Sequence, residues 1–441
     1  MKLDILKEAK IILDKFNNNG YDAYIVGGCV RDLLLGKTPK DYDITTSASP
    51  KETMELFKGN KTIPTGIKYG TVTVIINDIP IEVTTFRKEG KYIDNRKPER
   101  VEFLSSIEED LSRRDFTINA MAYNEKVGLI DLFKGRQDLE KGIVRVVGDG
   151  KERFKEDAIR ILRAYRFAGR YYFKIEEDTL TAIKQNMHLL NNVAKERIIP
   201  EIKEIFESGM DINKMDFITV LFPVIKECFN TYQNNKYHMQ NVGEHTYKTF
   251  NNIDNVFHLK MTMLLHDIGK VKTKTTDAEN IDHFYNHSDI SREMAKNILD
   301  DFKFDNETKY KILTLIKNHD KYMAPKNKYV KEKLGEFGEE LFLDLIKVRI
   351  ADDESKNHEL VEDNLKRFKD TEDFAKRVIR NKEPYKISDL KINGYDIKDL
   401  GFSGKEIGKI LKYLLNIVIE DKDKNEKSKL IELVREYKNK G

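Results

Sequence analysis

Three carboxylates in the first hundred residues could hold divalent cations. Asp41 and Asp43 are two positions apart, and residues at i and i+2 of a strand project to the same face. Converging carboxylates repel each other unless a cation lies between them, and Mg²⁺ prefers oxygen ligands of this kind. Glu82 lies in an apolar strand pattern, so it is either a solvent-facing residue or a third metal ligand. Two metals bridged by such a pair support in-line displacement at phosphorus.

A glycine pair upstream of these carboxylates could bind phosphate. Gly27 and Gly28 lie where a short strand turns into a helix. Glycines at this point allow backbone N–H groups to approach an anion, and a helix N-terminus favours negative charge. Arg31 could add a charge-assisted contact. The simpler interpretation, an ordinary turn, stays open from these residues alone.

An arginine stripe could contact a nucleotide. The segment EDAIRILRAYRFAGR, which starts at Glu156, predicts one helix with its arginines within an arc of about 120° and its apolar residues opposite. The stripe begins with Asp157 and uses only arginine, whose planar guanidinium suits base edges and phosphates. The alternative is a solvated basic face. The four arginines are Arg160, Arg163, Arg166 and Arg170.

The elements that would position these residues change in type along the chain. Apolar residues at helical spacing predict a first helix between residues 5 and 16, followed by a strand at 24–26. Two β-rich runs, 71–76 and 81–86, flank a turn at 77–80 and predict a hairpin. Beyond about residue 145 glycines become rarer and helical spacing dominates. The sequence therefore predicts an α+β head followed by an all-helical remainder.

Composition excludes several classes of protein. The chain has 441 residues, 39% of them hydrophobic and 35% charged, and it contains two cysteines. No apolar run approaches the ~18–20 residues that span a bilayer, and the N-terminal stretch is unlike a signal peptide, so we expect a cytoplasmic protein with no membrane partner. Two cysteines cannot form a disulfide framework. A formal net charge of +3 gives no global nucleic-acid signature, so any RNA binding must depend on local charge.

Four motifs in order resemble those of the class II tRNA nucleotidyltransferases, the family of CCA-adding enzymes and bacterial poly(A) polymerases. The resemblance implies a polymerase-β-like nucleotidyltransferase head, followed by an all-helical neck, body and tail. The motifs are Gly27-Gly28-x-Val30-Arg31-Asp32, Asp41-x-Asp43, Arg113-Arg114-Asp115-Phe116-Thr117-Ile118-Asn119-Ala120 and Glu156-Asp157-x-x-Arg160.

The resemblance also implies roles for individual residues. Asp41 and Asp43 would hold Mg²⁺, with Glu82 as the third catalytic carboxylate, for attack of an RNA 3′-hydroxyl on the α-phosphate of CTP or ATP. Protein side chains would take the place of a template in choosing the base. The implied nucleotide-binding residues are Gly27, Gly28, Arg31, Arg114, Asp115, Asp157, Arg160, Arg163 and Arg166.

A second group of metal-ligating residue types lies in the helical part. An adjacent His-Asp pair at the end of a buried helix can present both side chains to one metal. The group resembles the HD phosphohydrolase superfamily, which implies a second divalent metal of unknown identity and a phosphatase or phosphodiesterase activity. A degenerate domain that serves only as a scaffold for tRNA is the alternative. The matching residues are His245, His266, Asp267, His287, His319 and Asp352.

The predicted domains and the choice of activity follow from these resemblances. The segment 87–101 is similar to the flexible loop with which CCA-adding enzymes switch from C to A. Segments 393–397 and 400–408 are similar to their tRNA-binding tail. We therefore expect addition of C, C and A to tRNA, with a poly(A) polymerase, or an HD phosphohydrolase with an inactive head, as alternatives. The predicted divisions are a head at 1–145, a neck at 146–230, an HD-type domain at 231–360 and a tail at 361–441.

Overall fold

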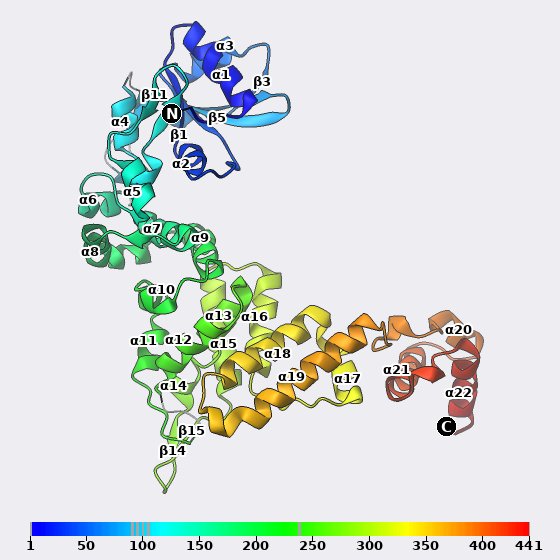
Figure 1. The fold of residues 1–441 in the computed structure, drawn as a ribbon. Coiled ribbons are helices and arrows are strands. Elements are labelled where there is room, and N and C mark those ends of the chain that lie inside the picture. The colour runs from blue at the N-terminus through cyan, green and yellow to red at the C-terminus, as the bar shows by residue number, and fades with distance from the viewer. Residues whose placement is uncertain are drawn as a thin grey trace. The chain divides into compact units, whose positions relative to one another are not determined.

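The computed structural model describes two compact units. The first comprises residues 1–210 and 214–222, and the second comprises residues 211–213 and 223–441 (Figure 1). The finer division into head, neck, body and tail stays a prediction. The structure describes residues 2–89, 92–93, 97–98, 101–103, 106–236 and 240–440.

A mixed seven-stranded sheet forms the centre of the head. Its strand order is β11-β10-β1-β2-β5-β4-β3, in which β2 and β5 are parallel and the other neighbours are antiparallel. Together with the helices that follow, this sheet confirms the predicted α+β class. Its strands are β1 (Ala23–Val26), β2 (Asp43–Thr46), β3 (Lys61–Gly66), β4 (Thr71–Ile76), β5 (Ile79–Thr85), β10 (Ala122–Asn124) and β11 (Gly128–Ile130).

The hairpin between β4 and β5 forms as the sequence predicts. Asn77 and Asp78 both have positive φ, 47° and 64°, which suits the two-residue turns that match strand twist. Alternate residues of β4 are buried, as expected for a strand with one core face. The turn is tighter than expected, because β5 begins at Ile79 and not at residue 81.

Part of the predicted 87–101 loop lies outside the described residues. Its described residues, together with those just beyond it, include short antiparallel pairs of β6 with β9 and of β7 with β8. These strands are β6 (Arg87–Glu89), β7 (Tyr92–Ile93), β8 (Lys97–Pro98) and β9 (Val101–Phe103).

One expected helix is two helices. The prediction of a continuous helix from Glu156 is wrong, because α6 ends at Glu156 and α7 starts at Ile159. Asp157 lies between them with extended backbone angles, φ −146° and ψ 101°, which interrupt the helical hydrogen bonds. Its side chain therefore projects from a junction and not from a helix face. A short parallel pair, β12 (Ile143–Val144) with β13 (Lys174–Ile175), flanks this region.

The helices of the first unit surround the sheet and continue beyond it. Buried apolar residues recur along one face of most of them, as in α1, where Ala9, Ile12, Leu13 and Phe16 are buried. They are α1 (Lys7–Asn18), α2 (Gly28–Leu34), α3 (Pro50–Leu56), α4 (Ile107–Ser112), α5 (Gly135–Lys141), α6 (Gly150–Glu156), α7 (Ile159–Tyr171), α8 (Glu177–Asn186), α9 (Lys195–Glu207) and α10 (Ile218–Leu221).

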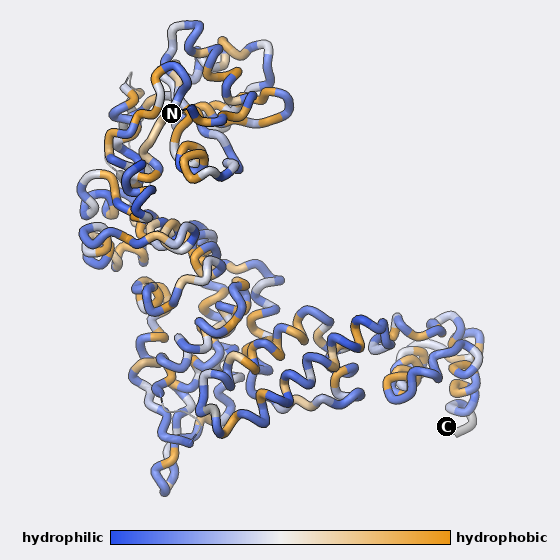
Figure 2. The backbone as a smooth tube through the Cα atoms, in the orientation of Figure 1, coloured by the Kyte–Doolittle hydropathy of each residue, from blue (hydrophilic) through white to orange (hydrophobic). Residues whose placement is uncertain are grey.

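The described residues of the second unit are mainly helical and include one short hairpin, β14 (Thr275–Thr276) with β15 (Asp282–His283). Figure 2 shows hydrophobic residues concentrated in α21, where Ile410, Leu414 and Val418 are fully buried. Its helices are α11 (Val224–Phe229), α12 (Val242–Asn252), α13 (Phe257–Leu265), α14 (Lys270–Thr273), α15 (His287–Asp301), α16 (Asn306–Asn318), α17 (Asn327–Phe337), α18 (Glu339–Asp353), α19 (His358–Arg380), α20 (Gly394–Asp399), α21 (Lys405–Glu420) and α22 (Lys427–Lys440).

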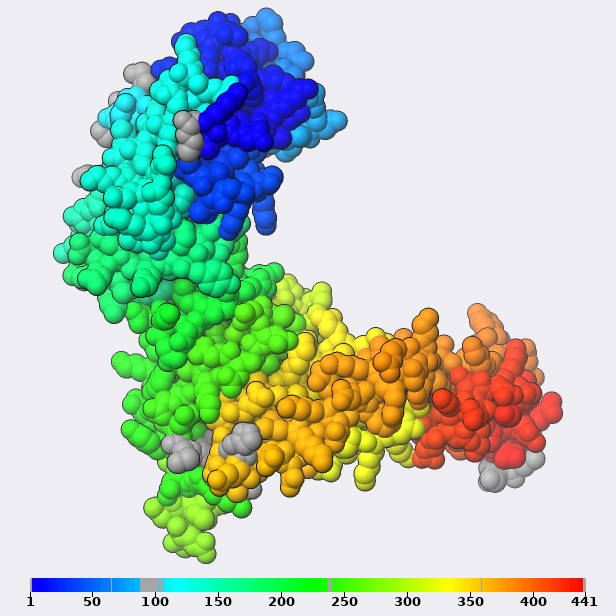
Figure 3. Space-filling view, in the orientation of Figure 1, coloured from blue at the N-terminus to red at the C-terminus, as the bar shows by residue number. Residues whose placement is uncertain are grey.

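The longest helix of this unit, α19, packs against α18 and lies along the surface in Figure 3. Its charged residues face outward while Val361, Phe368 and Val378 are buried. Among the described residues, no helix combines the length and apolar character needed to cross a membrane.

Tyr172 has a backbone conformation that disfavours a side chain. It caps α7 with φ 57° and ψ 36°, and it is 88% exposed. We predict that Tyr172→Gly raises the free energy of unfolding by about 1 kcal/mol, because glycine adopts left-handed angles without a Cβ clash. Urea unfolding followed by circular dichroism measures this change. Tyr172→Ala keeps the strain, so equal stability of the two variants would contradict the prediction.

Candidate active site and histidine cluster

The parallel pairing of β2 and β5 positions the predicted catalytic carboxylates. Asp43 is the register partner of Glu82, so both side chains project from the same face of the sheet. Asp41 lies two residues earlier, just before β2 begins, and all three carboxylates are exposed. The structure thus brings together the three residues that the sequence predicted, although Asp41 is not on the strand itself.

The electrostatics of Asp43 suit a divalent cation. Desolvation by the surrounding protein raises the pKa of Asp43, Arg114 opposes this rise, and the carboxylates of Glu82 and Asp41 add to it. The neighbouring like charges disfavour ionisation of Asp43, and a bound cation removes that penalty. Oxygen ligands on adjacent strands fit Mg²⁺.

The glycine loop lies against Arg114. Gly27 has φ 78° and donates its N–H to the Met121 carbonyl at 3.1 Å. A Cβ on Gly27 would lie 2.9 Å from a guanidinium nitrogen of Arg114, whereas a Cβ on Gly28 would meet Arg31 only at 3.5 Å. Gly27 therefore allows Arg114 to approach the loop, which places two predicted nucleotide-binding residues in contact.

Arg31 is buried and has partners within the protein. Its guanidinium donates to Asn119 Oδ1 at 2.5 Å and to Asp32 Oδ1 at 3.0 Å. It also lies 4.9 Å from the ring centre of Tyr171, at the end of α7. Arg31 thus ties α2 to α7, and its predicted contact with phosphate stays a prediction.

Asp115 joins the third motif to α7. Its carboxylate lies 2.7 Å from an Arg163 guanidinium nitrogen and accepts from Asn119 at 3.1 Å. Burial alone would raise the pKa of Asp115, but Arg163 and the hydrogen bond from Asn119 hold it below its ordinary value. The carboxylate is therefore a fixed negative charge that orients Arg163.

Asp157 and Arg160, which are predicted to select the nucleotide base, each form an ion pair within the protein. Asp157 receives a 2.7 Å hydrogen bond from Arg197 of α9. Arg160, which is 7% exposed, donates to Glu156 at 2.7 Å. Nothing in the sequence singles out Arg197, because it lies in an ordinary amphipathic helix and its contact with Asp157 spans 40 positions.

The rest of the arginine stripe pairs with α9. Arg166 lies 2.7 Å from Glu201, and Arg170 lies 3.7 Å from Glu204. Arg166 is therefore largely withdrawn from solvent, whereas Arg170 is exposed, as the alternative of a solvated basic face expects. The two glutamates are three residues apart and the two arginines four, so each pair lies on one face of its helix, and this helical spacing is the signal that could have found the glutamates.

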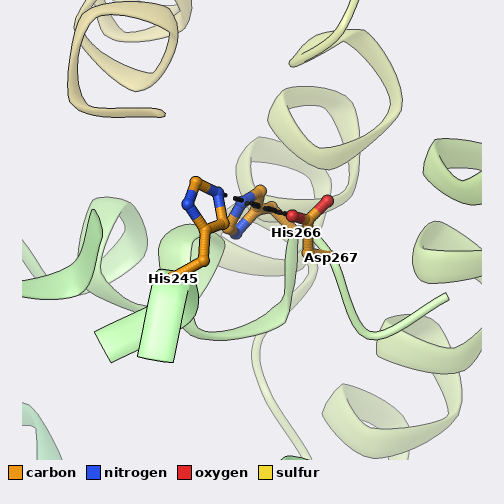
Figure 4. A group of neighbouring side chains, drawn as sticks. All are labelled: His245, His266 and Asp267. Atoms are coloured by element: carbon orange, nitrogen blue, oxygen red, sulfur yellow. Dashed lines mark ion pairs between the residues drawn. The ribbon is translucent and has the colours of Figure 1, made fainter. Parts of the chain in front are cut away.

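In the second unit, six residues that the sequence predicted converge on one centre. Asp267 lies at its middle, 3.5 Å from His245 Nε2, 3.3 Å from His266 Nε2, 3.4 Å from His287 Nε2 and 3.5 Å from His319 Nε2. Asp352 lies 3.0 Å from His245. Figure 4 shows the side chain of His245, from α12, beside those of the consecutive residues His266 and Asp267 at the end of α13.

The histidine rings are oriented by backbone carbonyls. His266, His287 and His319 each place Nδ1 2.7–2.9 Å from the carbonyl of the residue three positions earlier. A carbonyl only accepts, so Nδ1 is the donor and the neutral ring presents its Nε2 lone pair to the centre. Supporting bonds of this kind are typical of metal-ligating histidines.

Burial and charge also favour a cation at this centre. Among the described residues, His266 Nε2 and both Asp267 carboxylate oxygens are buried without a hydrogen-bond partner. Burial would raise the pKa of Asp267, but the charges of His266 and Lys270 hold it well below its ordinary value, so Asp267 is ionised. Burial lowers the pKa of His245 and His287 to about 4, which keeps both rings neutral. These residues fit a divalent metal with imidazole and carboxylate ligands.

Comparison with known sequences places the chain in a family. The profile of the poly A polymerase head domain matches residues 23–145, and that of tRNA nucleotidyltransferase domain 2 matches residues 272–434. The CCA-adding enzyme of Oceanobacillus iheyensis is 41% identical over 296 residues, which cover 64% of this chain and 73% of that protein. The chain belongs to the CCA-adding enzyme family.

Other members of the family match over shorter or longer stretches. The CCA-adding enzyme of Ligilactobacillus salivarius is 51% identical over 195 residues, or 44% of this chain, so the match spans about half (48%) of that relative. The crystal structure of the Bacillus stearothermophilus CCA-adding enzyme in complex with CTP is 28% identical, with a TM-score of 0.69 and 99% of each chain covered. The Thermotoga maritima CCA-adding enzyme complexed with tRNA is 25% identical, with a TM-score of 0.60, and covers 97% of this chain and 94% of that one.

Family membership confirms the predicted resemblance to tRNA nucleotidyltransferases and the predicted fold. The roles of individual residues, and the resemblance of the histidine cluster to HD phosphohydrolases, stay predictions at this point.

The contact between Gly27 and Arg114 generates a paired prediction. We expect Gly27→Ala to weaken CTP binding at least about tenfold, because a Cβ there is strained by the positive φ and displaces Arg114. Gly28→Ala, whose Cβ has room, should bind CTP nearly as the wild type does. Isothermal titration calorimetry measures both affinities, and equal weakening of the two variants would show that the contact is unimportant.

The histidine cluster generates a metal-binding prediction. Burial would lower the pKa of His266, but Asp267 and Asp352 raise it above its ordinary value, so a proton competes with a metal for Nε2 as the pH falls. We expect Co²⁺ to bind more tightly as pH rises, with proton release. The heat of binding should then differ between two buffers of unlike ionisation enthalpy.

Variants test where that Co²⁺ binds. His319→Ala should weaken binding at least about 100-fold, since even supporting partners of ligands contribute 10–100-fold. His188→Ala, which removes an exposed histidine of the first unit, should have no effect. Binding that survives His319→Ala would place the metal elsewhere.

Proposed function

We propose that this protein adds C, C and A to the 3′ end of tRNA, with CTP and ATP as substrates and without a nucleic-acid template. The observation that carries the proposal is the same-face pairing of Asp43 with Glu82 beside Arg114 and the glycine loop. The solved relatives that contain CTP or tRNA, and that match nearly the whole chain, support it.

In this proposal Asp41 and Asp43 hold Mg²⁺, and Glu82 completes the acidic face. Bound Mg²⁺ would supply charge neutralisation at the α-phosphate and the leaving pyrophosphate. Arg114, which lies against Gly27, would contact the phosphates of the incoming nucleotide. Asp43 must be ionised to hold Mg²⁺. The surrounding protein raises the pKa of Asp43, and bound Mg²⁺ would favour the ionised form.

The base is chosen by side chains around α7. Asp157 would accept from the exocyclic amine, which C and A both carry, while Arg160 would donate to ring acceptors. Arg197 and Glu156 fix these two side chains when no nucleotide is bound. Because Asp157 is held by Arg197 of α9 and Arg160 of α7 is held by Glu156, the selecting groups are oriented before the nucleotide arrives.

The experiment is extension of a tRNA that ends at its discriminator base, with CTP and ATP supplied together. We expect products that stop after three nucleotides with the sequence CCA. A poly(A) polymerase would instead yield longer products that lack C. The tail and the 87–101 segment favour the first outcome, because each is similar to a feature that CCA-adding enzymes use.

Removal of a catalytic carboxylate gives a further prediction. Asp43→Asn should reduce incorporation at least about 1000-fold, because one neutral ligand weakens the metal clamp that stabilises the transition state. Asp78→Asn, at the exposed β4–β5 turn, is the matched control and should incorporate normally. Single-turnover rates on the same tRNA measure both. Wild-type rates in Asp43→Asn would refute the catalytic assignment.

We also propose a second, hydrolytic function for the histidine cluster. Four imidazoles and two aspartates in the order of the HD phosphohydrolases would hold a divalent metal and hydrolyse phosphate esters. The orientation of three Nε2 atoms by backbone carbonyls supports this proposal. Hydrolysis that persists in Asp43→Asn and disappears in Asp267→Asn would assign it to this cluster.

The cellular setting follows from the proposed substrates. A protein that acts on tRNA with CTP and ATP works in the cytoplasm, and tRNA is its proposed macromolecular partner.

A further inference from the structure

A cavity of about 390 Å³ borders the histidine cluster. Its size suits a small ligand of the order of a nucleotide. Three cations and four carboxylates line it, so a divalent metal in the cluster makes the lining net positive. The cations are Lys270, Arg349 and Lys356, and the carboxylates are Asp267, Asp320, Asp352 and Asp353.

The cations lie next to the residues proposed to bind metal. Lys356 Nζ lies 2.8 Å from Asp352 and 2.7 Å from Asp353. Lys270 Nζ lies 2.7 Å from Asp267. An anion that meets the metal would therefore meet these ammonium groups as well, which favours a phosphate group at this end of the cavity.

Asp353 is a lining carboxylate that does not belong to the group proposed to hold the metal. It is the last residue of α18, it is 2% exposed, and its Oδ1 accepts from Lys356. Its Oδ2 is buried and has no hydrogen-bond partner within the described part of the chain. An ionised carboxylate only accepts hydrogen bonds, and leaving a buried acceptor unpaired is costly. The group that satisfies this oxygen must therefore be a donor.

We propose that Asp353 is a specificity-determining residue that accepts a hydrogen bond from a hydroxyl adjacent to the phosphate ester of the ligand. The proposal rests on the hydrolytic function proposed above. A ribose phosphate carries such a hydroxyl on the neighbouring carbon, and its 2′-deoxy counterpart does not. The phosphate lies toward the metal and Lys356, and the hydroxyl lies toward Asp353 Oδ2.

The test compares two ligands that differ only in that hydroxyl. Adenosine 3′-monophosphate and 2′-deoxyadenosine 3′-monophosphate are titrated into the Co²⁺-loaded full chain by calorimetry. We expect the ribonucleotide to bind about tenfold or more tightly, because hydrogen bonds to charged groups are among the stronger ones. A second arm uses short RNA with a 3′-terminal phosphate against its 2′-deoxy version. A preference in either arm supports the proposal, and equal binding in both overturns it.

Variants assign the preference to Asp353. In Asp353→Asn the charge is lost, and in Asp353→Ala the acceptor is lost, so the ratio of affinities should fall toward one in both. Asp320→Asn removes a carboxylate from the same cavity but from an exposed position, and its ratio should stay as in the wild type. If Asp353→Ala does not fold, Asp353→Asn carries the test. A ratio that is unchanged in Asp353→Asn overturns the proposal.

Two further readouts separate this inference from its alternatives. Co²⁺ binding should be equal in wild type and Asp353→Asn, because a loss would mean that Asp353 holds metal and not the ligand hydroxyl. Hydrolysis of p-nitrophenyl phosphate tests the cluster without any ribose. Hydrolysis without a ribose preference would sink only the role of Asp353, whereas no hydrolysis together with no nucleotide binding would sink the hydrolytic function itself.

Discussion

Parallel pairing of β2 with β5 creates the electrostatic constraint on which the first unit depends. It fixes Asp43 beside Glu82, and two carboxylates held at one sheet face cannot separate to relieve their repulsion. Arg114 partly compensates this charge, and it can do so only because residue 27 has no side chain. The glycine loop and the acidic pair look like separate motifs in the sequence. They are linked through Arg114, which lies against the loop and partly compensates the charge of the pair.

A second theme is the pairing of charges between distant segments. Asp115 with Arg163, and Asp157 with Arg197, each join a motif to a helix elsewhere in the first unit. Both pairs are only partly buried, so solvent screens them and each contributes less to stability than a fully buried pair would. These pairs therefore have two roles, since they hold the helices together and also orient the side chains proposed to select the base.

Features that depend on neighbouring residues could be predicted from the sequence more fully than contacts between distant residues. The hairpin at Asn77-Asp78 follows from turn chemistry, whereas strand periodicity left Glu82 either solvent-facing or a metal ligand, and only the pairing of β2 with β5 places it beside Asp43. The break at Asp157 was missed, because no glycine or proline marks it and a contact with Arg197, 40 residues away, accompanies it. The convergence of the histidines came from family order alone, since residues up to 107 positions apart meet only through helix packing. Asp353 gave no sequence signal, because its importance depends on burial.

The division into two units has a practical meaning for anyone who shortens the chain. The polypeptide passes between the units three times, after residues 210, 213 and 222. Within the first unit, Phe217 packs edge-on against Tyr165 of α7, with 5.0 Å between the ring centres. A cut at residue 210 would therefore remove an aromatic contact from α7, the helix proposed to select the base. The shortest fragment that preserves the core of the first unit ends at residue 222, and it includes residues 211–213 of the second unit.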